Sequence, residues 1–66
     1  MIYKEYELIE WEREPGKWRV AVARTDGTIV KSQNAEVSAF VTSSDMPTIE
    51  QSIQEAKNLI DEGIIR

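Results

Sequence analysis

The spacing of apolar residues in the last third of the chain predicts one amphipathic helix over about residues 48–62. Its apolar positions recur every three or four residues, which places them in one stripe along a helix. The stripe consists of Ile49, Ile53, Ala56, Ile60 and Ile64, with Leu59 beside it. Thr48 with Gln51 fits a capping box, and Gly63 supplies a left-handed stop. We therefore expect a helix with both ends defined.

Before this helix, the pattern changes to β-branched and aromatic residues interleaved with charged ones. Such alternation is typical of half-buried strands, and we place two of them at about residues 2–13 and 17–25. Between them, Pro15 and Gly16 provide the fixed and the positive dihedral angles of a tight turn. The two strands are therefore predicted to form an antiparallel hairpin.

The register of this hairpin decides which residues face the helix. If pairing runs outward from Glu14 and Lys17 without a bulge, one face collects the residues expected to seat the helix: Ile9, Trp11, Trp18, Val20 and Val22. The opposite face then carries Tyr6 and Leu8 beside Ala21 and Ala23, with a charged rim of Glu10, Glu12, Lys17 and Arg19. A β-bulge near Leu8 would instead turn Tyr6 and Leu8 toward the core.

A second turn at Asp26-Gly27 leads into a third strand at about residues 28–42, which a polar stretch interrupts near 32–36. This segment forms either one broken strand or two strands. The fold class we predict is α+β: an antiparallel sheet of three or four strands with one C-terminal helix packed on one face. Residues 1–66 are expected to form a single small domain.

Composition narrows the functions that this domain can have. The 66 residues include no Cys and no His. Without His, the chain lacks the commonest metal ligand and proton shuttle, and without Cys it has no thiolate chemistry. The net charge is −4, and residues 32–66 hold the excess, with two basic and six acidic side chains. Phosphate binding draws its affinity from Lys and Arg, so this half argues against a nucleic-acid or anionic-membrane partner.

The first ten residues carry four charges, and no stretch approaches the roughly 20 apolar residues of a membrane span. We therefore expect a cytoplasmic location and no membrane partner.

The abundant carboxylates are better explained by ion pairing than by catalysis. Glu10, Glu12 and Glu14 alternate along one strand, and Lys17 and Arg19 lie across from them. The hydroxyls of residues 42–44 precede an acid, but no His is present to act as a base. We predict no catalytic residue, no metal ligand and no cofactor, and hence that the protein is not an enzyme.

Several segments resemble those of small uncharacterised bacterial proteins that begin with a Tyr-Lys-Gly-Tyr-like strand and end in a helix with an Ala-x-x-x-x-Ile-Asp-like run. The segments are Tyr3–Ile9, Trp18–Val22, Asp26-Gly27, Phe40, Ile53, Ala56-Lys57, Leu59–Asp61 and Gly63. Glu5 departs from this pattern, which usually has Gly there. The resemblance implies a fold and no activity. The strands-then-helix order is also similar to that of partial RNase H-like antitoxin domains, although the Gly-rich segment before their helix is absent.

The order of elements resembles AP2 domains and the arm-binding domains of tyrosine recombinases, which lay a sheet into a DNA major groove. Trp11, Trp18 and the basic hairpin residues would suit such a role, whereas the glutamates count against it. We predict a non-catalytic protein–protein interaction module or small regulatory accessory protein, with a nucleic-acid-binding sheet module of the recombinase-arm type as the alternative. The partner is another protein or a second copy. The residues predicted to bind it are Tyr6, Leu8, Lys17, Arg19, Ala21 and Ala23.

Overall fold

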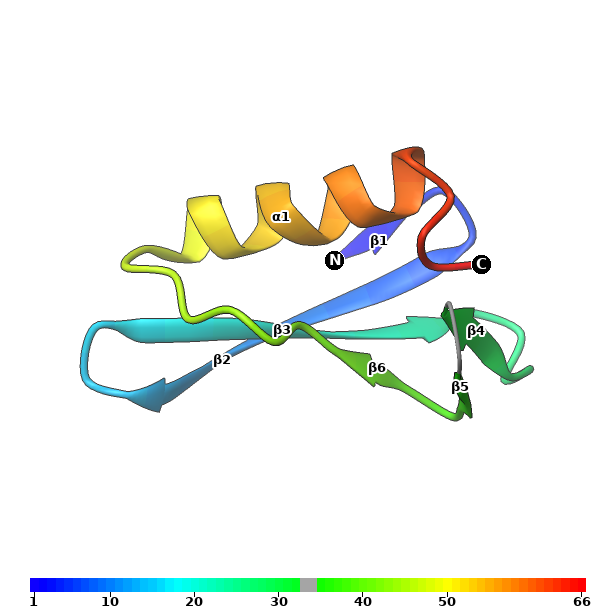
Figure 1. The fold of residues 1–66 in the computed structure, drawn as a ribbon, viewed down its shortest axis with the longest axis horizontal. Helices are drawn as coiled ribbons and strands as arrows, with labels where there is room; N and C mark the ends of the chain where they lie inside the picture. Colours follow the sequence, from blue (N-terminus) through cyan, green and yellow to red (C-terminus); the bar gives the residue numbers. More distant parts are fainter. Residues whose placement is uncertain (33–34) are drawn as a thin grey trace.

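A computed structural model describes residues 1–32 and 35–66. In chain order the elements are β1 (Ile2–Tyr3), β2 (Tyr6–Glu14), β3 (Lys17–Arg24), β4 (Val30–Ser32), β5 (Ala35–Val37), β6 (Phe40–Val41) and α1 (Ile49–Asp61). Four of the strands form an antiparallel sheet in the order β1-β2-β3-β6, and α1 packs across one of its faces (Figure 1). The predicted α+β class with a single C-terminal helix is confirmed, and the main sheet has four strands.

The segment at 28–42, predicted as either one broken strand or two strands, forms three short strands. Strands β4 and β5 make a second, two-stranded sheet, and only β6 joins β3. The stretch after the helix extends the second sheet, because Ser32 bridges Ile65 and the backbones of Lys31 and Arg66 exchange two hydrogen bonds of 2.6 Å. Part of the predicted interruption near 32–36, at Gln33 and Asn34, lies outside the described residues.

The first predicted strand is broken near its start. Lys4 has a φ of 56°, and the chain reverses so that Tyr3 pairs with Tyr6 and Ile2 with Glu7. A positive φ is uncommon outside glycine, and nothing in the composition of this segment marks it as a turn. The side chains help to hold it: the Tyr3 hydroxyl and Lys4 Nζ both reach Asp61 of α1, at 2.7 and 2.6 Å.

The hairpin of β2 and β3 contains a bulge that shifts its register by one residue. Glu14 pairs with Lys17 as predicted, but Glu12 pairs with Trp18, so that Arg13 is the extra residue. Every pair beyond it differs from the unbulged register, and Leu8 lies opposite Val22. The bulge lies beside the turn rather than near Leu8, and it turns Tyr6 and Leu8 to the helix side and Ile9 and Trp11 to the open side.

The core therefore differs from the predicted one. Its buried residues are Tyr6, Leu8, Val20, Val22, Val30, Ala56, Ile60 and Ile65, with Tyr3, Phe40, Ile53 and Leu59 partly buried against them. The predicted seat of the helix was correct for Trp18, Val20 and Val22 and wrong for Ile9 and Trp11. The prediction that Tyr6, Leu8, Glu10 and Glu12 lie on the open face was correspondingly wrong. Tyr6 and Leu8 belong to the core, and Glu10 and Glu12 pair with Val20 and Trp18 on the helix side.

The helix forms where its sequence pattern places it. Thr48 is the N-cap, its Oγ1 accepting a hydrogen bond from the Gln51 N–H at 3.2 Å. Gly63 has a φ of 74°, and the Ile64 N–H then donates to the Leu59 carbonyl at 3.0 Å, which ends the helix. Ala56 and Ile60 are buried and Ile53 partly so, whereas Ile49 at the start of the predicted stripe stays 37% exposed.

Candidate functional site

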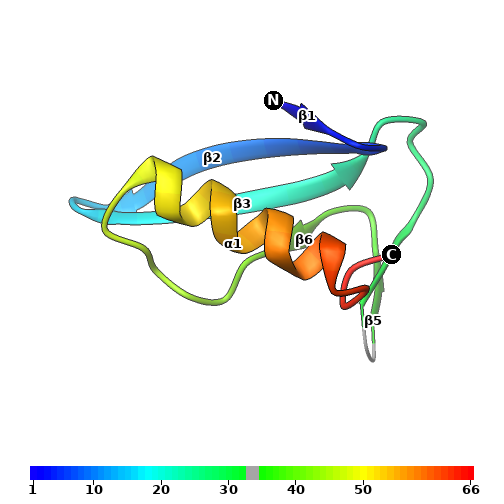
Figure 2. The ribbon, with the colours of Figure 1, turned by 90° about the horizontal axis from the view of Figure 1, so that it is seen from above.

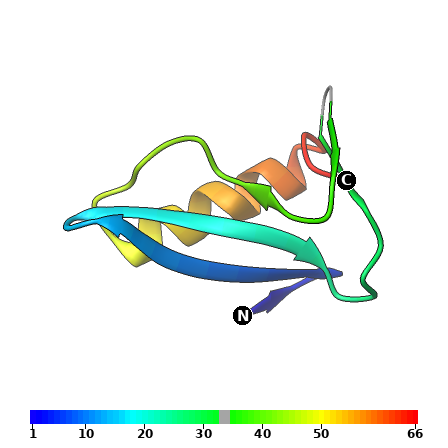
Figure 3. The same ribbon diagram turned by 90° about the horizontal axis from the view of Figure 1, so that it is seen from below.

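The sheet face opposite α1 is covered by no other element among residues 1–32 and 35–66, as Figure 3 shows from below. Ile9, Ala21 and Val41 form one cross-strand row on this face, since Ile9 pairs with Ala21 and Ala21 with Val41. Trp11 lies on the same face and pairs with Arg19. Ile9, Trp11 and Val41 are 52%, 38% and 44% exposed. We call the set of Ile9, Trp11, Ala21, Ala23 and Val41 the open apolar patch.

An ion-pair cluster borders the patch at the end near the β2–β3 turn. Arg13 holds Asp45 through both carboxylate oxygens, with Nε to Oδ1 at 3.0 Å and Nη2 to Oδ2 at 2.6 Å. Arg19 Nε donates to the same Oδ1 at 2.7 Å. Hydrogen bonds from Arg13 and then Arg19 hold the pKa of Asp45 well below its usual range. Asp45 thus offsets one of the two positive charges that Arg13 and Arg19 bring to this face.

The predicted partner-binding residues fall into three groups. Arg19, Ala21 and Ala23 lie on the open face as predicted, and Lys17 lies beside the turn, paired with Glu14 at 3.0 Å. Tyr6 and Leu8 are 8% and 0% exposed and belong to the core, so their assignment to the interface was wrong. The bulge at Arg13 is the physical reason.

Sequence reasoning missed Ile9, Trp11 and Val41. Tyr6 and Leu8 share one strand phase, and Ile9 and Trp11 share the opposite phase, so only one of these pairs can face α1. That conflict was the available signal for a bulge, but the bulge we considered was near Leu8, whereas it lies at Arg13. Val41 carried a weaker signal, since β6 spans only two residues and offers little alternation to read.

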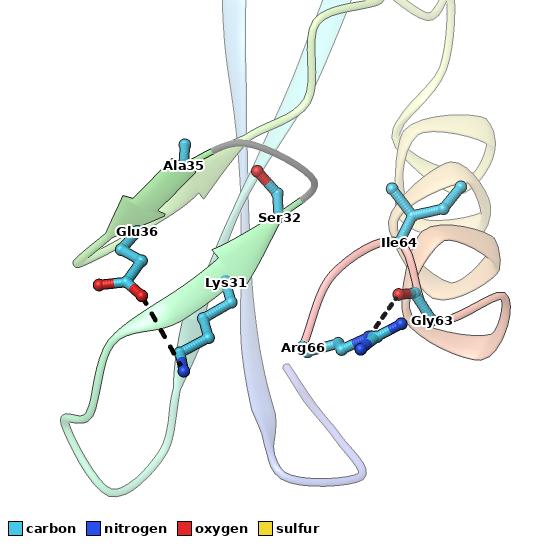
Figure 4. A pocket seen from close by; sticks show the side chains of 7 residues that line it. All are labelled: Lys31, Ser32, Ala35, Glu36, Gly63, Ile64 and Arg66. Atoms are coloured by element: carbon cyan, nitrogen blue, oxygen red, sulfur yellow. Dashed lines mark hydrogen bonds and ion pairs between the residues drawn. The ribbon is translucent and has the colours of Figure 1, made fainter.

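A second feature is a groove of about 530 Å³ between the β4–β5 pair and the segment that follows α1 (Figure 4). Lys31 and Glu36 on its wall form a long ion pair of 3.9 Å, and Arg66 Nε donates to the Gly63 carbonyl at 3.0 Å. Ser32 is the only residue with a hydroxyl group among those that line the groove. The only lining residue that could act as a base toward it is Glu36, which is already paired with Lys31. Among the described residues that line it, the groove therefore has no assembled acid–base set.

The remaining polar cluster joins the β1–β2 turn to α1. Asp61 accepts from the Tyr3 hydroxyl and from Lys4, and the ammonium groups of Lys4 and Lys57 lie 5.4 and 5.1 Å from the centre of the Tyr3 ring. The hydrogen bond to Asp61 raises the pKa of Tyr3, so the phenol stays protonated and acts as a donor. The cluster is fully accounted for by structural pairing.

Within the part of the chain that the structure describes, no three His, Cys, Asp or Glu side chains come together as a metal site would require. The helix α1, described in full, is too short and too polar to cross a membrane. No family model matches the sequence, and no match was found among curated proteins or among solved structures. The function has to be inferred from the structure itself. The open apolar patch is a candidate binding surface, because its exposed apolar side chains are covered by no other element of the described chain.

Proposed function

We propose that the protein binds another protein through the open apolar patch and catalyses no reaction. The observation that carries the proposal is the row of Ile9, Ala21 and Val41 next to Trp11. The two branched side chains are about half exposed and the tryptophan 38% exposed, on a face where nothing else in the described chain packs. A large aromatic side chain in an apolar centre is the arrangement that most often contributes binding energy at protein interfaces.

The border of the patch supports the same function. Arg13, Arg19 and Asp45 lie side by side in one ion-paired cluster, so this rim is polar and hydrogen-bonded. An apolar centre with a polar, hydrogen-bonded rim is how transient protein interfaces are commonly built. The sequence's lack of Cys and His supports a role without catalysis.

The alternative is a nucleic-acid-binding sheet, and the charges give it less support. A sheet that reads DNA presents free Arg and Lys to phosphates and bases. Here Arg13 and Arg19 share one carboxylate and Lys17 pairs with Glu14, so each of the three cations already has an acidic partner. The net charge of −4 opposes a phosphate partner further.

A matched pair of variants tests the proposal. Ile9 and Ile29 are both 52% exposed, but Ile29 lies in the connection before β4, away from the open face. The tagged chain is made in the cells in which it naturally occurs, and bound proteins are quantified for the unchanged chain, Ile9→Glu and Ile29→Glu, before and after nuclease treatment. We expect a bound protein that Ile9→Glu loses at least about tenfold, a change of about 1.4 kcal/mol, and that Ile29→Glu retains.

The opposite results are equally clear. Equal loss from both variants would mean that the open apolar patch has no special part in binding. Retention that disappears on nuclease treatment, or that falls steeply with salt, would favour the nucleic-acid alternative.

A further inference from the structure

Strand β2 has a backbone edge that is paired only at its start. On the side away from β3, Ile2 and Tyr3 of β1 pair with Glu7 and Tyr6, and Met1 exchanges two backbone hydrogen bonds with Leu8, at 2.7 and 2.8 Å. Beyond Leu8, no described residue pairs with this edge, and Figure 2 shows β1 beside only the start of β2. We call the stretch from Ile9 to Glu12 the free edge.

The direction of the free backbone groups follows from the ladder. In an antiparallel strand, successive residues direct their N–H and C=O groups to alternate sides. Because Leu8 directs both groups outward to Met1, Glu10 and Glu12 direct theirs outward as well, while Ile9 and Trp11 bond to β3. Two donor–acceptor pairs are therefore presented at the spacing that another strand requires.

The side chains on the free edge carry one charge sign. Glu10 and Glu12 are exposed, and neither forms an ion pair with a Lys or Arg in the described chain; Glu12 accepts only from the Gly16 N–H, at 3.1 Å. Ile9 and Trp11, at the intervening positions, point to the open apolar patch. One side of the edge is thus acidic and the other apolar.

This pattern disfavours pairing with a second copy. In a symmetric antiparallel pair of two β2 strands, residues whose backbone groups point outward must lie opposite one another. Glu10 would then lie opposite Glu10 or Glu12 of the second copy, or Glu12 would lie opposite Glu12. Like charges directly opposite each other destabilise a ladder, and charged edge strands are a common protection against self-association. A partner strand with cations at these positions would meet no such penalty.

We propose that the free edge of β2 binds an extended segment of a partner protein in which Lys or Arg alternates with aliphatic or aromatic residues. The cations lie opposite Glu10 and Glu12, and the apolar residues continue the open apolar patch beside Ile9 and Trp11. Backbone hydrogen bonds provide affinity and the alternate side chains provide specificity. The inference rests on the proposed function and names the chemistry of the partner.

The test uses two capped peptides, acetyl-Thr-Lys-Val-Arg-Val-Lys-Thr-amide and its acidic counterpart acetyl-Thr-Glu-Val-Glu-Val-Glu-Thr-amide. Binding to the full chain is followed by NMR, together with amide hydrogen exchange. We expect the basic peptide to bind and to slow exchange at the amides of Glu10 and Glu12, which have no ladder partner in the free protein. The amides of Ile9 and Trp11 should change little, since β3 already protects them.

Two double variants distinguish peptide binding at the free edge from a general effect of the protein's net charge. Glu10→Lys with Glu12→Lys should reverse the preference, with the basic peptide binding at least about tenfold more weakly and the acidic peptide becoming the ligand. Glu50→Lys with Glu62→Lys makes the same change in net charge at the two ends of α1 and should leave both affinities as they were. An NMR spectrum with native dispersion establishes that each variant is folded.

Equal weakening by both double variants would overturn the inference, because the attraction would then depend on net charge alone. Binding without slowed exchange at Glu10 and Glu12, or equal binding of the two peptides, would overturn it too. If the basic peptide fails to bind while capture of a cellular partner still depends on Ile9, the edge inference fails and the proposed function stands. If capture is also independent of Ile9, both fail.

Discussion

Leu8 and Val22 lie directly opposite each other in the β2–β3 ladder, and the side chains of both are fully buried against α1. Their pairing sets the faces of the whole hairpin, because a strand changes face at every residue. Ile9, the next residue, is consequently 52% exposed on the opposite side. The open apolar patch exists because this one pair occupies the core.

The first prediction tests this assignment of faces. Leu8→Ala should lower the free energy of unfolding by about 2 to 5 kcal/mol, since it leaves a cavity in the core. Ile9→Ala should change it by less than about 1 kcal/mol, because about half of that side chain is already in water. Urea denaturation of both variants measures the difference, and comparable losses would show that the register is wrong.

A deletion tests whether Arg13 is the extra residue of the β2–β3 hairpin. Removing Arg13 takes out the extra residue of the bulge and leaves Glu12 opposite Trp18 and Glu14 opposite Lys17. We expect the fold to survive with a loss below about 2 kcal/mol, which reflects the missing pair with Asp45 and the altered turn. Chemical shifts and cross-strand proton contacts between Leu8 and Val22 provide the measurement. A different partner for Leu8 would contradict the assignment of Arg13 as the extra residue.

Much of the fold could be predicted because its signals are local. The helix has an N-cap at Thr48, a stop at Gly63 and a stripe between them, and each acts within one or two turns of chain. The bulge at Arg13 could not be located in this way. Its cause is the competition between two pairs, Leu8 with Val22 and Trp11 with Val20, for the same core, and that choice depends on packing against α1 rather than on the turn.

The candidate site was predicted only where it did not depend on the register of β2. Ala21 and Arg19 belong to β3, whose alternation of apolar and small or polar residues is regular, and their side of the sheet was correct. Tyr6 lies in the core and Trp11 lies on the open face, the reverse of the prediction for both, because the bulge shifts the register of β2 by one residue.

The Asp45 cluster predicts a specific dependence of stability on pH. The pKa of Asp45 is lower in the folded chain than in the unfolded chain, where it is about 3.9. A depressed folded pKa stabilises the fold above the unfolded value, and that stabilisation is lost as the pH falls toward the folded value. Asp45→Asn should therefore be less stable than the unchanged chain at neutral pH.

The same difference should shrink as the pH is lowered below about 4, because the unfolded form of the unchanged chain then takes up a proton at Asp45 while the folded form still holds the carboxylate charged. Denaturant midpoints measured at several pH values for both proteins give the comparison. Glu36→Gln is the control, since its exposed pair with Lys31 spans 3.9 Å and should contribute little at any pH. A gap for Asp45→Asn that is independent of pH would contradict the ion-pair account.

Ser52 offers a stabilising change. Its side chain is 1% exposed on the face of α1 that meets the sheet, and its Oγ has no hydrogen-bond partner in the described structure. Ser52→Ala should raise the free energy of unfolding by about 1 kcal/mol, because it removes an unsatisfied hydroxyl and improves helix propensity. Ser38→Ala, at an exposed position outside the helix, should have no comparable effect in the same urea titration. A destabilised Ser52→Ala variant would mean that the hydroxyl is satisfied.

The most direct test of the open apolar patch as a binding surface is site-specific photo-crosslinking in the cells in which the protein naturally occurs. A benzophenone amino acid is placed singly at Ile9, Val41 or Ile29, three exposed positions of which only the first two lie on the patch. We predict the same protein adduct from positions 9 and 41 and none from position 29. Adducts of equal yield from all three positions, or adducts from position 29 alone, would contradict the account.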